Sequence, residues 1–404
     1  MAHGSAPSRR EFLAAAAAGL VAAGHGAAAP EETTLAAIRE HRMGTLAVRA
    51  RPGAEVRITQ LAHQFRFGTA ISWRMFQSPE QPDSKAYLEV LESNFNAAVH
   101  ENALKWYHTG RKPHAADYSD PDRMTDWCLA HGIRVRGHCL FWAVERYVQD
   151  WVKALSDAEL REAVRRRAEG VVAHFRGRIA EYDVNNEMMH GRYFRERLGE
   201  GIAVDMFRWA QAADPEAVLY VNDYGVLHSG GEAYARHIQG LLDRGAPVGG
   251  IGIQGHLGGG GVDPARVRAT LDTLARFRLP IVITEFDLNT RDQAAKARGL
   301  EALYRTCFAH PAVDGILMWG FWEGRHWRPD AALWTRKWEP TLAAKRYRRL
   351  VFQEWWTRFQ GRADAHGRCA ARAFYGRHRV EADGRAAEVE LARQAGRAEV
   401  DLAT

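Results

Sequence analysis

Short apolar stretches alternate with longer amphipathic stretches eight times between residues 67 and 355. The apolar stretches are rich in β-branched and aromatic residues, which favour strands, and each is followed by a stretch with helical periodicity. Regular alternation of strand and helix is typical of a parallel sheet covered by helices. We expect strands at residues 67–72, 95–101, 135–142, 179–186, 218–223, 250–256, 281–287 and 315–321.

Two of the intervening helices carry clear start signals. Ser156 and Glu159 predict a capping box, because the serine side chain can accept a hydrogen bond from the backbone of Glu159 while the glutamate reaches back. This helix is expected to run to about Phe175. Asp263 followed by a proline predicts a second helix start, and that helix is expected to continue through Arg276.

The number of strand and helix units favours one fold over its alternative. Eight units over residues 67–355 suit a (β/α)8 TIM barrel, which typically takes about 250 residues. An open doubly wound sheet would normally show a glycine-rich phosphate turn after the first strand, and Gly68-Thr69-Ala70 continues without one. The sequence therefore predicts an α/β fold built on a (β/α)8 barrel.

The segments that flank the barrel have a β-like pattern. Residues 45–50 and 55–60 alternate apolar and polar positions around a turn at 51–54, which is a hairpin signal. Beyond residue 355, glycines separate several short segments of similar pattern. Neither flank buries enough area alone. We therefore expect an N-terminal β segment at 30–66 and a C-terminal one at 356–404, with 43–66 and 356–404 pairing into one split β-sandwich.

The first 29 residues have the pattern of a sorting signal. Paired arginines, Arg9 and Arg10, precede an alanine-rich apolar run at 14–23, and small residues follow at 27–29. This arrangement resembles a twin-arginine signal peptide, with a disordered alanine-rich extension as the alternative. The run is shorter than the roughly 20 residues that a membrane span needs, so no stable membrane anchor is expected. We expect export to the periplasm or the extracellular space.

Charge and cysteine usage exclude several classes of function. The net charge is +6, but basic and acidic residues are interspersed, so no nucleic-acid partner is expected. The four cysteines form no C-x-x-C pair, which excludes a zinc ribbon and a thioredoxin-like site. Cys128 and Cys139 could face each other, and we expect free thiols rather than a bridge. The histidines show no metal-binding spacing. We expect no metal, no cofactor and a monomer.

Polar side chains recur where the expected strands end. In a barrel these carboxyl ends meet at one mouth, where active sites lie. Glu187 follows Asn186 at the end of the fourth strand and Glu285 follows Thr284 on the seventh, and two carboxylates across a barrel mouth are what glycosidic cleavage needs. Trp319, on the eighth strand, offers a flat surface against which a sugar ring can stack. The other polar residues of this set are Glu101, Asn102, His138, Asn186, Asp223, Gln254, His256 and Asp287.

Five segments carry a family resemblance. They are 101–106 (ENALKW), 137–142 (GHCLFW), 182–187 (YDVNNE), 252–257 (GIQGHL) and 283–287 (ITEFD). In this order they resemble the signature stretches of glycoside hydrolase family 10, the retaining endo-β-1,4-xylanases, and the resemblance covers about residues 67–334. It implies a catalytic domain at 67–355 that acts on xylan, a polysaccharide.

The resemblance also implies roles for individual residues. Glu187 would be the acid/base and Glu285 the nucleophile, with carboxyl groups about 5–5.5 Å apart, as retention of configuration requires. Asn186 would bind the sugar 2-hydroxyl, and His256 would orient Glu285, with Gln254 and Asp287 nearby. The remaining sugar-binding residues would be Glu101, Asn102, Lys105, His138 and Trp142 on the glycone side, Tyr224 on the aglycone side, and Trp319 and Trp327 at the cleavage point.

Two positions depart from the family pattern. Ala143 stands where a histidine is usual and Glu145 where a glutamine is usual, and both are expected beside the glycone subsites. The reaction chemistry does not depend on them, but sugar affinity does. The alternatives are therefore a β-1,4- or mixed-linkage glucanase on the same scaffold, and a polysaccharide-binding pseudoenzyme without turnover.

Overall fold

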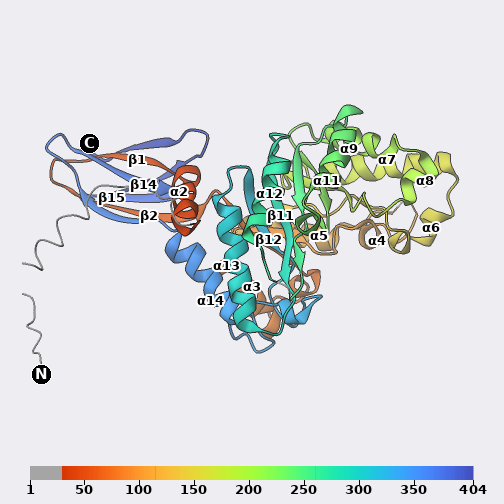
Figure 1. Cartoon of the computed structure of the whole chain (residues 1–404), viewed down its shortest axis with the longest axis horizontal. Coiled ribbons are helices and arrows are strands. Elements are labelled where there is room, and N and C mark those ends of the chain that lie inside the picture. Colours follow the sequence, from red (N-terminus) through yellow and green to blue (C-terminus); the bar gives the residue numbers. More distant parts are fainter. Residues whose placement is uncertain (1–29, 114, 260, 404) are drawn as a thin grey trace, which may run out of the picture.

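The computed structural model describes residues 30–403 apart from residues 114 and 260. The expected signal peptide at residues 1–29 lies outside this part of the chain. Within the described residues, no helix has both the length and the apolar character that a membrane crossing requires. Figure 1 shows a barrel-like body with a smaller β unit beside it, and helices α2 (Pro30–Arg42), α13 (Gln293–Ala309) and α14 (Leu342–Arg349) near the junction.

The strands of the larger body are all parallel and follow chain order around a ring. β3 pairs with β4 on one side and with β12 on the other, and the bridge between Gly137 and Tyr182 joins the two remaining ends. The (β/α)8 TIM barrel predicted from the sequence is confirmed. Its strands are β3 (Arg66–Ile71), β4 (Ala97–His100), β5 (Arg134–Arg136), β6 (Phe141–Trp142), β7 (Glu181–Asn186), β8 (Val218–Asp223), β9 (Gly250–Ile253), β11 (Ile281–Leu288) and β12 (Val313–Met318), with β10 (His256–Leu257) beside β11.

Two of the expected strands are interrupted. The strand expected at 135–142 is split into β5 and β6, although Gly137 and Leu140 between them still bond to the backbone of β7. The peptide bond between His138 and Cys139 is cis. The strand expected at 250–256 ends at Ile253, because Gly255 adopts a positive φ of 81° that breaks the extended backbone.

Helices surround the barrel and bury their apolar faces against it. The capping box at Ser156 and Glu159 is present, and α7 ends at His174, one residue before the expected end. Asp263 caps α12 by accepting from the backbone of Ala265 and Arg266. The helices outside the strands are α3 (Pro82–Asn94), α4 (Trp106–Thr109), α5 (Ser119–Ala130), α6 (Asp150–Lys153), α7 (Asp157–His174), α8 (Tyr193–Leu198), α9 (Ile202–Ala213), α10 (Val226–Ser229), α11 (Glu232–Asp243), α12 (Pro264–Ala275), α13 and α14, followed by a π-helical turn (Leu350–Glu354).

The smaller unit is built from both flanks of the barrel. β1 (Met43–Arg49) lies between β14 (Arg368–Phe374) and β17 (Arg397–Asp401). β2 (Glu55–His63) lies between β13 (Arg358–Arg362) and β15 (Gly376–Ala382), and β16 (Arg385–Leu391) follows at the edge. The two sheets share a separate core, to which Leu46, Val48, Val56, Ile58 and Val380 belong. We call this unit the sandwich.

One part of the N-terminal flank differs from the expectation. Residues 30–42 were expected to belong to a β segment, and they form the helix α2 instead. Glu31 and Glu32 lie in its first turn and Arg39, His41 and Arg42 in its last, an arrangement that the helix dipole favours. Ile38 is buried against the barrel core, so α2 links the two units. All four cysteines are free thiols, as expected for Cys128 and Cys139.

Candidate active site

A cleft of about 590 Å³ lies at the carboxyl ends of the barrel strands. It contains both candidate carboxylates and the aromatic residues expected around them. The lining residues are Glu101, Asn102, Lys105, Tyr107, His138, Trp142, Arg146, Tyr147, Asn186, Glu187, Tyr224, Gly225, His228, Gln254, His256, Glu285, Trp319, Trp327 and Arg328.

Glu187 is held at the end of β7 in an unusual backbone conformation. Its φ is +60°, which side chains other than glycine rarely adopt, and the pairing of β7 with β8 shifts register just before it. Trp142 Nε1 donates to one carboxylate oxygen at 2.8 Å, and Gln254 Nε2 donates to the other at 3.0 Å. Strain at a strand end thus aims an acidic side chain into the cleft between two donors.

Glu285 lies within β11 and is almost fully buried. The pairing of β11 with β12 shifts register around this residue, as the β7 pairing does near Glu187. Asn222 Nδ2 lies 2.8 Å from Oε1, and His256 Nε2 lies 3.2 Å from Oε2. Each oxygen therefore has a donor, which keeps the carboxylate in a fixed orientation facing the cleft.

Asn222 connects the two carboxylate environments. Its Nδ2 also donates to Asn186 Oδ1 at 2.9 Å, and its own Oδ1 accepts from Thr284 Oγ1 at 2.6 Å. Asn186 Nδ2 in turn lies 3.2 Å from Glu187 Oε1. A continuous network of hydrogen bonds therefore joins Glu285 to Glu187. Sequence reasoning missed Asn222, although it directly precedes Asp223 at the end of a correctly predicted strand.

His256 lies between two carboxylates. Its Nδ1 is 2.9 Å from Asp287 Oδ2, and its Nε2 faces Glu285. Burial alone would lower the pKa of His256, but the hydrogen bonds and charges of Asp287 and Glu285 outweigh burial and raise the pKa to about 9. The ring is thus an imidazolium near neutral pH. Asp287 lies behind the cleft wall and also accepts from Trp327 Nε1 at 2.8 Å and from Arg328 at 3.1 Å.

His138 is held from below by a buried carboxylate. Its Nδ1 lies 2.9 Å from Asp183 Oδ2 and 3.9 Å from Glu285 Oε1. Burial alone would raise the pKa of Asp183, but Arg136 and His138 beside it lower the pKa overall. Asp183 is therefore a negative partner that orients His138 toward Glu285.

The end of the cleft where we expect the glycone combines charge with aromatic surface. Lys105 Nζ lies 4.5 Å from the ring centre of Trp142 and 3.3 Å from Asn102 Oδ1. Tyr147 stacks on Trp142 with ring centres 3.8 Å apart. Burial raises the pKa of Glu101, although the charge of Lys105 acts in the opposite direction. Hydroxyl groups and ring faces of a sugar could both be recognised here.

Exposed aromatic rings lie at the rim. Trp327 is 48% exposed and Tyr224 is 41% exposed, whereas Trp319 is 7% exposed. Tyr224 stacks on His190 with ring centres 3.8 Å apart, and Asp223 holds that histidine at 2.8 Å. Large apolar side chains left open at a cleft rim mark a binding surface for a ligand.

The two departures from the family pattern are chain neighbours of the cleft residues Trp142 and Arg146 but do not themselves line the cleft. Neither Ala143 nor Glu145 lines the cleft: Ala143 is buried on the other side of the barrel wall, and Glu145 points to solvent. The turn after Trp142 presents Arg146 and Tyr147 to the cleft instead. Sequence reasoning missed these two residues and also Tyr107, His228 and Arg328. Among the described residues, no group of His, Cys, Asp and Glu side chains has the geometry of a metal site.

A barrel with a buried glutamate and a second glutamate in the same aromatic cleft is typical of the glycoside hydrolase families that have a TIM barrel. The chain belongs to glycosyl hydrolase family 10, whose model matches residues 58–351. This match includes every residue of the cleft described above.

Two curated relatives illustrate the range of the family. The chain is 41% identical over 319 residues to anti-sigma-I factor RsgI6 of Acetivibrio thermocellus and 37% identical over 334 residues to endo-1,4-beta-xylanase 1 of Arabidopsis thaliana. These matches take in 79% and 81% of this chain, but the chain spans only 41% and 34% of the two relatives.

Solved structures show the same fold. Xylanase 10B from Thermotoga petrophila RKU-1, in complex with xylobiose, superposes with a TM-score of 0.66 at 25% identity, covering 72% of this chain and 95% of that one. The endo-1,4-beta-xylanase XylE of Penicillium canescens gives a TM-score of 0.63 at 26% identity, covering 70% and 93%.

Proposed function

We propose that the chain is a retaining endo-1,4-β-xylanase that hydrolyses internal linkages of xylan. The observation that carries this proposal is the pair of carboxylates in one cleft, with Glu285 fixed by Asn222 and His256 and Glu187 fixed by Trp142 and Gln254. Two differently held carboxyl groups suit the two roles that retention of configuration requires.

In the first step, Glu285 attacks the anomeric carbon while Glu187 gives its proton to the leaving glycosidic oxygen. The bond to the leaving sugar breaks and a covalent glycosyl ester forms on Glu285. In the second step, Glu187 takes a proton from water, which attacks the same carbon and releases Glu285 as a carboxylate. His256, as an imidazolium 3.2 Å from Glu285, favours the ionised form of the nucleophile that both attack and release need.

The substrate assignment rests on relatives and on the shape of the cleft. A family 10 neighbour was solved with xylobiose, and the Arabidopsis relative is named an endo-1,4-beta-xylanase. In this chain, aromatic rings at both ends of the cleft suit a chain of pyranose rings. The anti-sigma relative is named for a different role, so turnover itself has to be measured.

The first test compares substrates and variants. Reducing-sugar release from xylan, cellulose and mixed-linkage glucan is measured for the wild type, Glu285→Ala and Glu145→Gln. We expect release mainly from xylan, lost in Glu285→Ala and retained in Glu145→Gln, which removes an exposed carboxylate outside the cleft. Equal release by Glu285→Ala would exclude it as the nucleophile. Release from glucan alone would change the substrate, and no release from any polymer would favour the pseudoenzyme.

The second test is stereochemical. Proton NMR during the first minutes of hydrolysis records the anomer of the new reducing end before mutarotation. Retention predicts the β anomer first. An α anomer would contradict the double displacement, and the two carboxyl groups would then have to lie roughly 6.5–9.5 Å apart.

We also propose that the protein is exported through the twin-arginine route and works as a monomer. The support is the arginine pair ahead of an alanine-rich run at residues 14–23. Replacing Arg9 and Arg10 together by Lys should retain the protein in the cytoplasm, and cell fractionation would detect it. Light scattering on the purified chain gives the molar mass, and the mass of a dimer would contradict the proposed monomer.

A further inference from the structure

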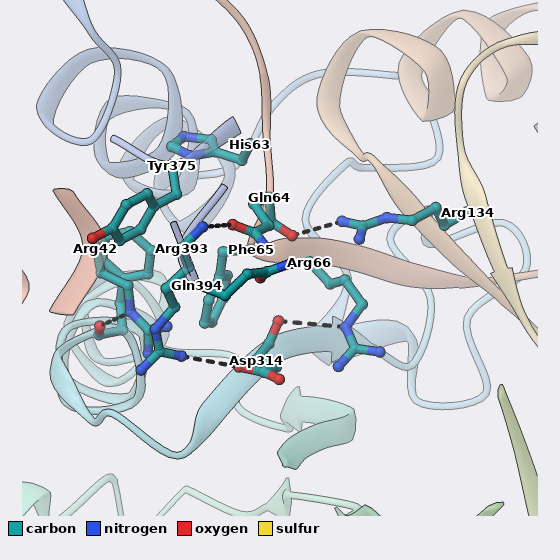
Figure 2. Close-up of a pocket in the computed structure, with 11 residues that line it drawn as sticks. Arg42, His63, Gln64, Phe65, Arg66, Arg134, Asp314, Tyr375, Arg393 and Gln394 are labelled. Atoms are coloured by element: carbon teal, nitrogen blue, oxygen red, sulfur yellow. Dashed lines mark hydrogen bonds and ion pairs between the residues drawn. The ribbon is translucent and has the colours of Figure 1, made fainter. Parts of the chain in front are cut away.

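A second cavity, of about 450 Å³, lies at the opposite end of the barrel from the catalytic cleft. We call it the junction cavity, because the starts of β3, β5 and β12 meet the sandwich and the end of α2 there. Figure 2 shows arginines from these different elements around it. Its lining residues are Arg42, His63, Gln64, Phe65, Arg66, Arg134, Phe308, Asp314, Tyr375, Arg393 and Gln394.

The lining carries an excess of positive charge. Four arginines meet one carboxylate, Asp314. Burial lowers the pKa of His63 to about 4, so this histidine is neutral near neutral pH. Arg66 is compensated from behind, because its guanidinium forms an ion pair with the buried Glu181. Arg393 Nη1 lies 3.3 Å from Asp314. Arg42 and Arg134 have no carboxylate within ion-pair distance among the described residues.

Arg42 is the most unusual of the four, because only 4% of it is exposed. Its Nε donates to Phe308 O at 2.6 Å, and one Nη donates to the backbone oxygens of His310 and Val313. Burial and the nearby charge of Arg393 lower the pKa of Arg42 to about 9. The rings of Phe65 and Phe308 and the charge of Asp314 partly offset the cost of burying this guanidinium. No carboxylate pairs with it directly among the described residues, so an anion in the cavity would offset the remainder.

Arg134 and Arg393 lie on different sides of the junction cavity, so that a ligand between them could contact both. Arg134, at the start of β5, uses one nitrogen to donate to Gln64 O at 2.8 Å. Arg393 follows β16 in the sandwich, and its Nη2 donates to Pro311 O at 2.7 Å. Each has further guanidinium N–H groups for which the described residues provide no hydrogen-bond partner. Guanidinium groups recognise carboxylates and phosphates through paired, charge-assisted hydrogen bonds.

We propose that the junction cavity binds a small organic anion of about monosaccharide size that carries a carboxylate or a phosphate group, such as a uronic acid or a sugar phosphate. The ligand bridges the barrel, through Arg42 and Arg134, to the sandwich, through Arg393. This site is distinct from the catalytic cleft, because the two share no lining residue. Between them, the interior of the barrel holds the buried ion pairs of Arg66 with Glu181 and of Arg136 with Asp183.

Calorimetric titration of the full chain with inorganic phosphate, glucuronate and glucose tests the proposal. We expect saturable binding of phosphate or glucuronate with a Kd of roughly 1 mM or tighter, and none of glucose. Binding of only one anion identifies the group that the site prefers. The same anion should raise the melting temperature relative to chloride at equal ionic strength, because it binds only the folded state.

Variants locate the site. Arg134→Gln and Arg393→Gln should each weaken anion binding by about 10-fold or more. Asp314→Asn should strengthen it, because it removes the carboxylate that occupies Arg393. Arg379→Gln, an arginine on the outer face of the sandwich, and Arg146→Gln, in the catalytic cleft, are the charge-matched controls and should leave the Kd unchanged. Circular dichroism checks that each variant is folded.

Three outcomes would overturn the proposal. They are no saturable binding of either anion, equal weakening by Arg379→Gln, and loss of binding in Arg146→Gln but not in Arg134→Gln. The last would place the anion in the catalytic cleft. Because no readout depends on turnover, failure here would leave the proposed xylanase activity untouched.

Discussion

At the mouth of the barrel two acidic side chains are held by neutral or cationic donors, whereas at its other end four arginines surround a cavity with one carboxylate. Both clusters include residues at the strand ends of the barrel, and a buried chain of ion pairs lies between them, from Arg66 through Glu181, Arg136 and Asp183 to His138. At the mouth every carboxylate oxygen of Glu187 and Glu285 has a donor. At the junction, part of the guanidinium surface has no partner among the described residues. The charged groups at the mouth are placed for the proposed reaction. The arginines at the junction are placed to bind the proposed anion and to hold the barrel and the sandwich together.

The largest effect is expected at the mouth of the barrel, for the proposed proton donor Glu187. Glu187→Gln should lower kcat on xylan by about 10²–10⁴-fold, because the leaving oxygen loses its proton donor. On an aryl xyloside with a good leaving group the loss should be much smaller in the first step, which a burst of released phenol would reveal. The free energy of unfolding, measured in urea, should change by less than about 1 kcal/mol, since Glu187 lies at the surface of the cleft. An equal loss on both substrates would contradict the acid role.

The second prediction addresses the sandwich. Ile58 is fully buried between the two sheets, and Ile58→Ala should lower the free energy of unfolding by about 2–5 kcal/mol through lost burial and a cavity. kcat and KM measured well below the melting temperature should stay within about twofold of the wild type, because no sandwich residue reaches the catalytic cleft. A large loss of kcat in a folded Ile58→Ala protein would show that the sandwich affects the catalytic cleft, contrary to this prediction.

The sequence was most informative where a candidate residue lies near the carboxyl end of a strand that the local pattern predicts. Glu187 directly follows β7 and Glu285 lies in the second half of β11, so the carboxyl-end geometry of a barrel places both at one mouth. The pattern failed where the backbone departs from a regular element. The positive φ of Gly255 ends β9 early, and the turn after Trp142 directs Arg146 and Tyr147 inward in place of Ala143 and Glu145. Adjacency in sequence does not specify the direction of a side chain in such a turn.

Contacts between distant segments could not be predicted from the sequence, for a different reason. Arg42, Arg134 and Arg393 come together only when α2, β5 and the turn after β16 pack at the junction. Each is an ordinary basic residue in its own segment, with no motif around it. The helix α2 was also missed, because residues 30–42 were grouped with the β pattern that follows them.

The third prediction uses the pKa of His256. The folded-state pKa of about 9 lies above the ordinary value of 6.5, so this histidine stabilises the fold fully below about pH 6.5 and progressively less as pH rises through 9. His256→Gln should therefore destabilise the protein by about 1–3 kcal/mol more at pH 6 than at pH 10. Parallel urea titrations at the two pH values measure this difference. A difference of the opposite sign would show that His256 is neutral in the folded protein.

The smallest effect concerns the rim, where the mouth meets solvent. Trp327 packs edge-to-face near His256 with ring centres 4.8 Å apart and donates to Asp287, so it can contact sugar and hold the positioning network at once. Trp327→Ala should raise KM for xylan by roughly 2–10-fold, since one aromatic contact is lost. Trp327→Phe keeps a ring but not the indole N–H, and it should leave KM close to that of the wild type while kcat falls. If the two variants raise KM equally, the donation to Asp287, and not the ring surface, is what the substrate depends on, and the mouth would then be governed by its polar network alone.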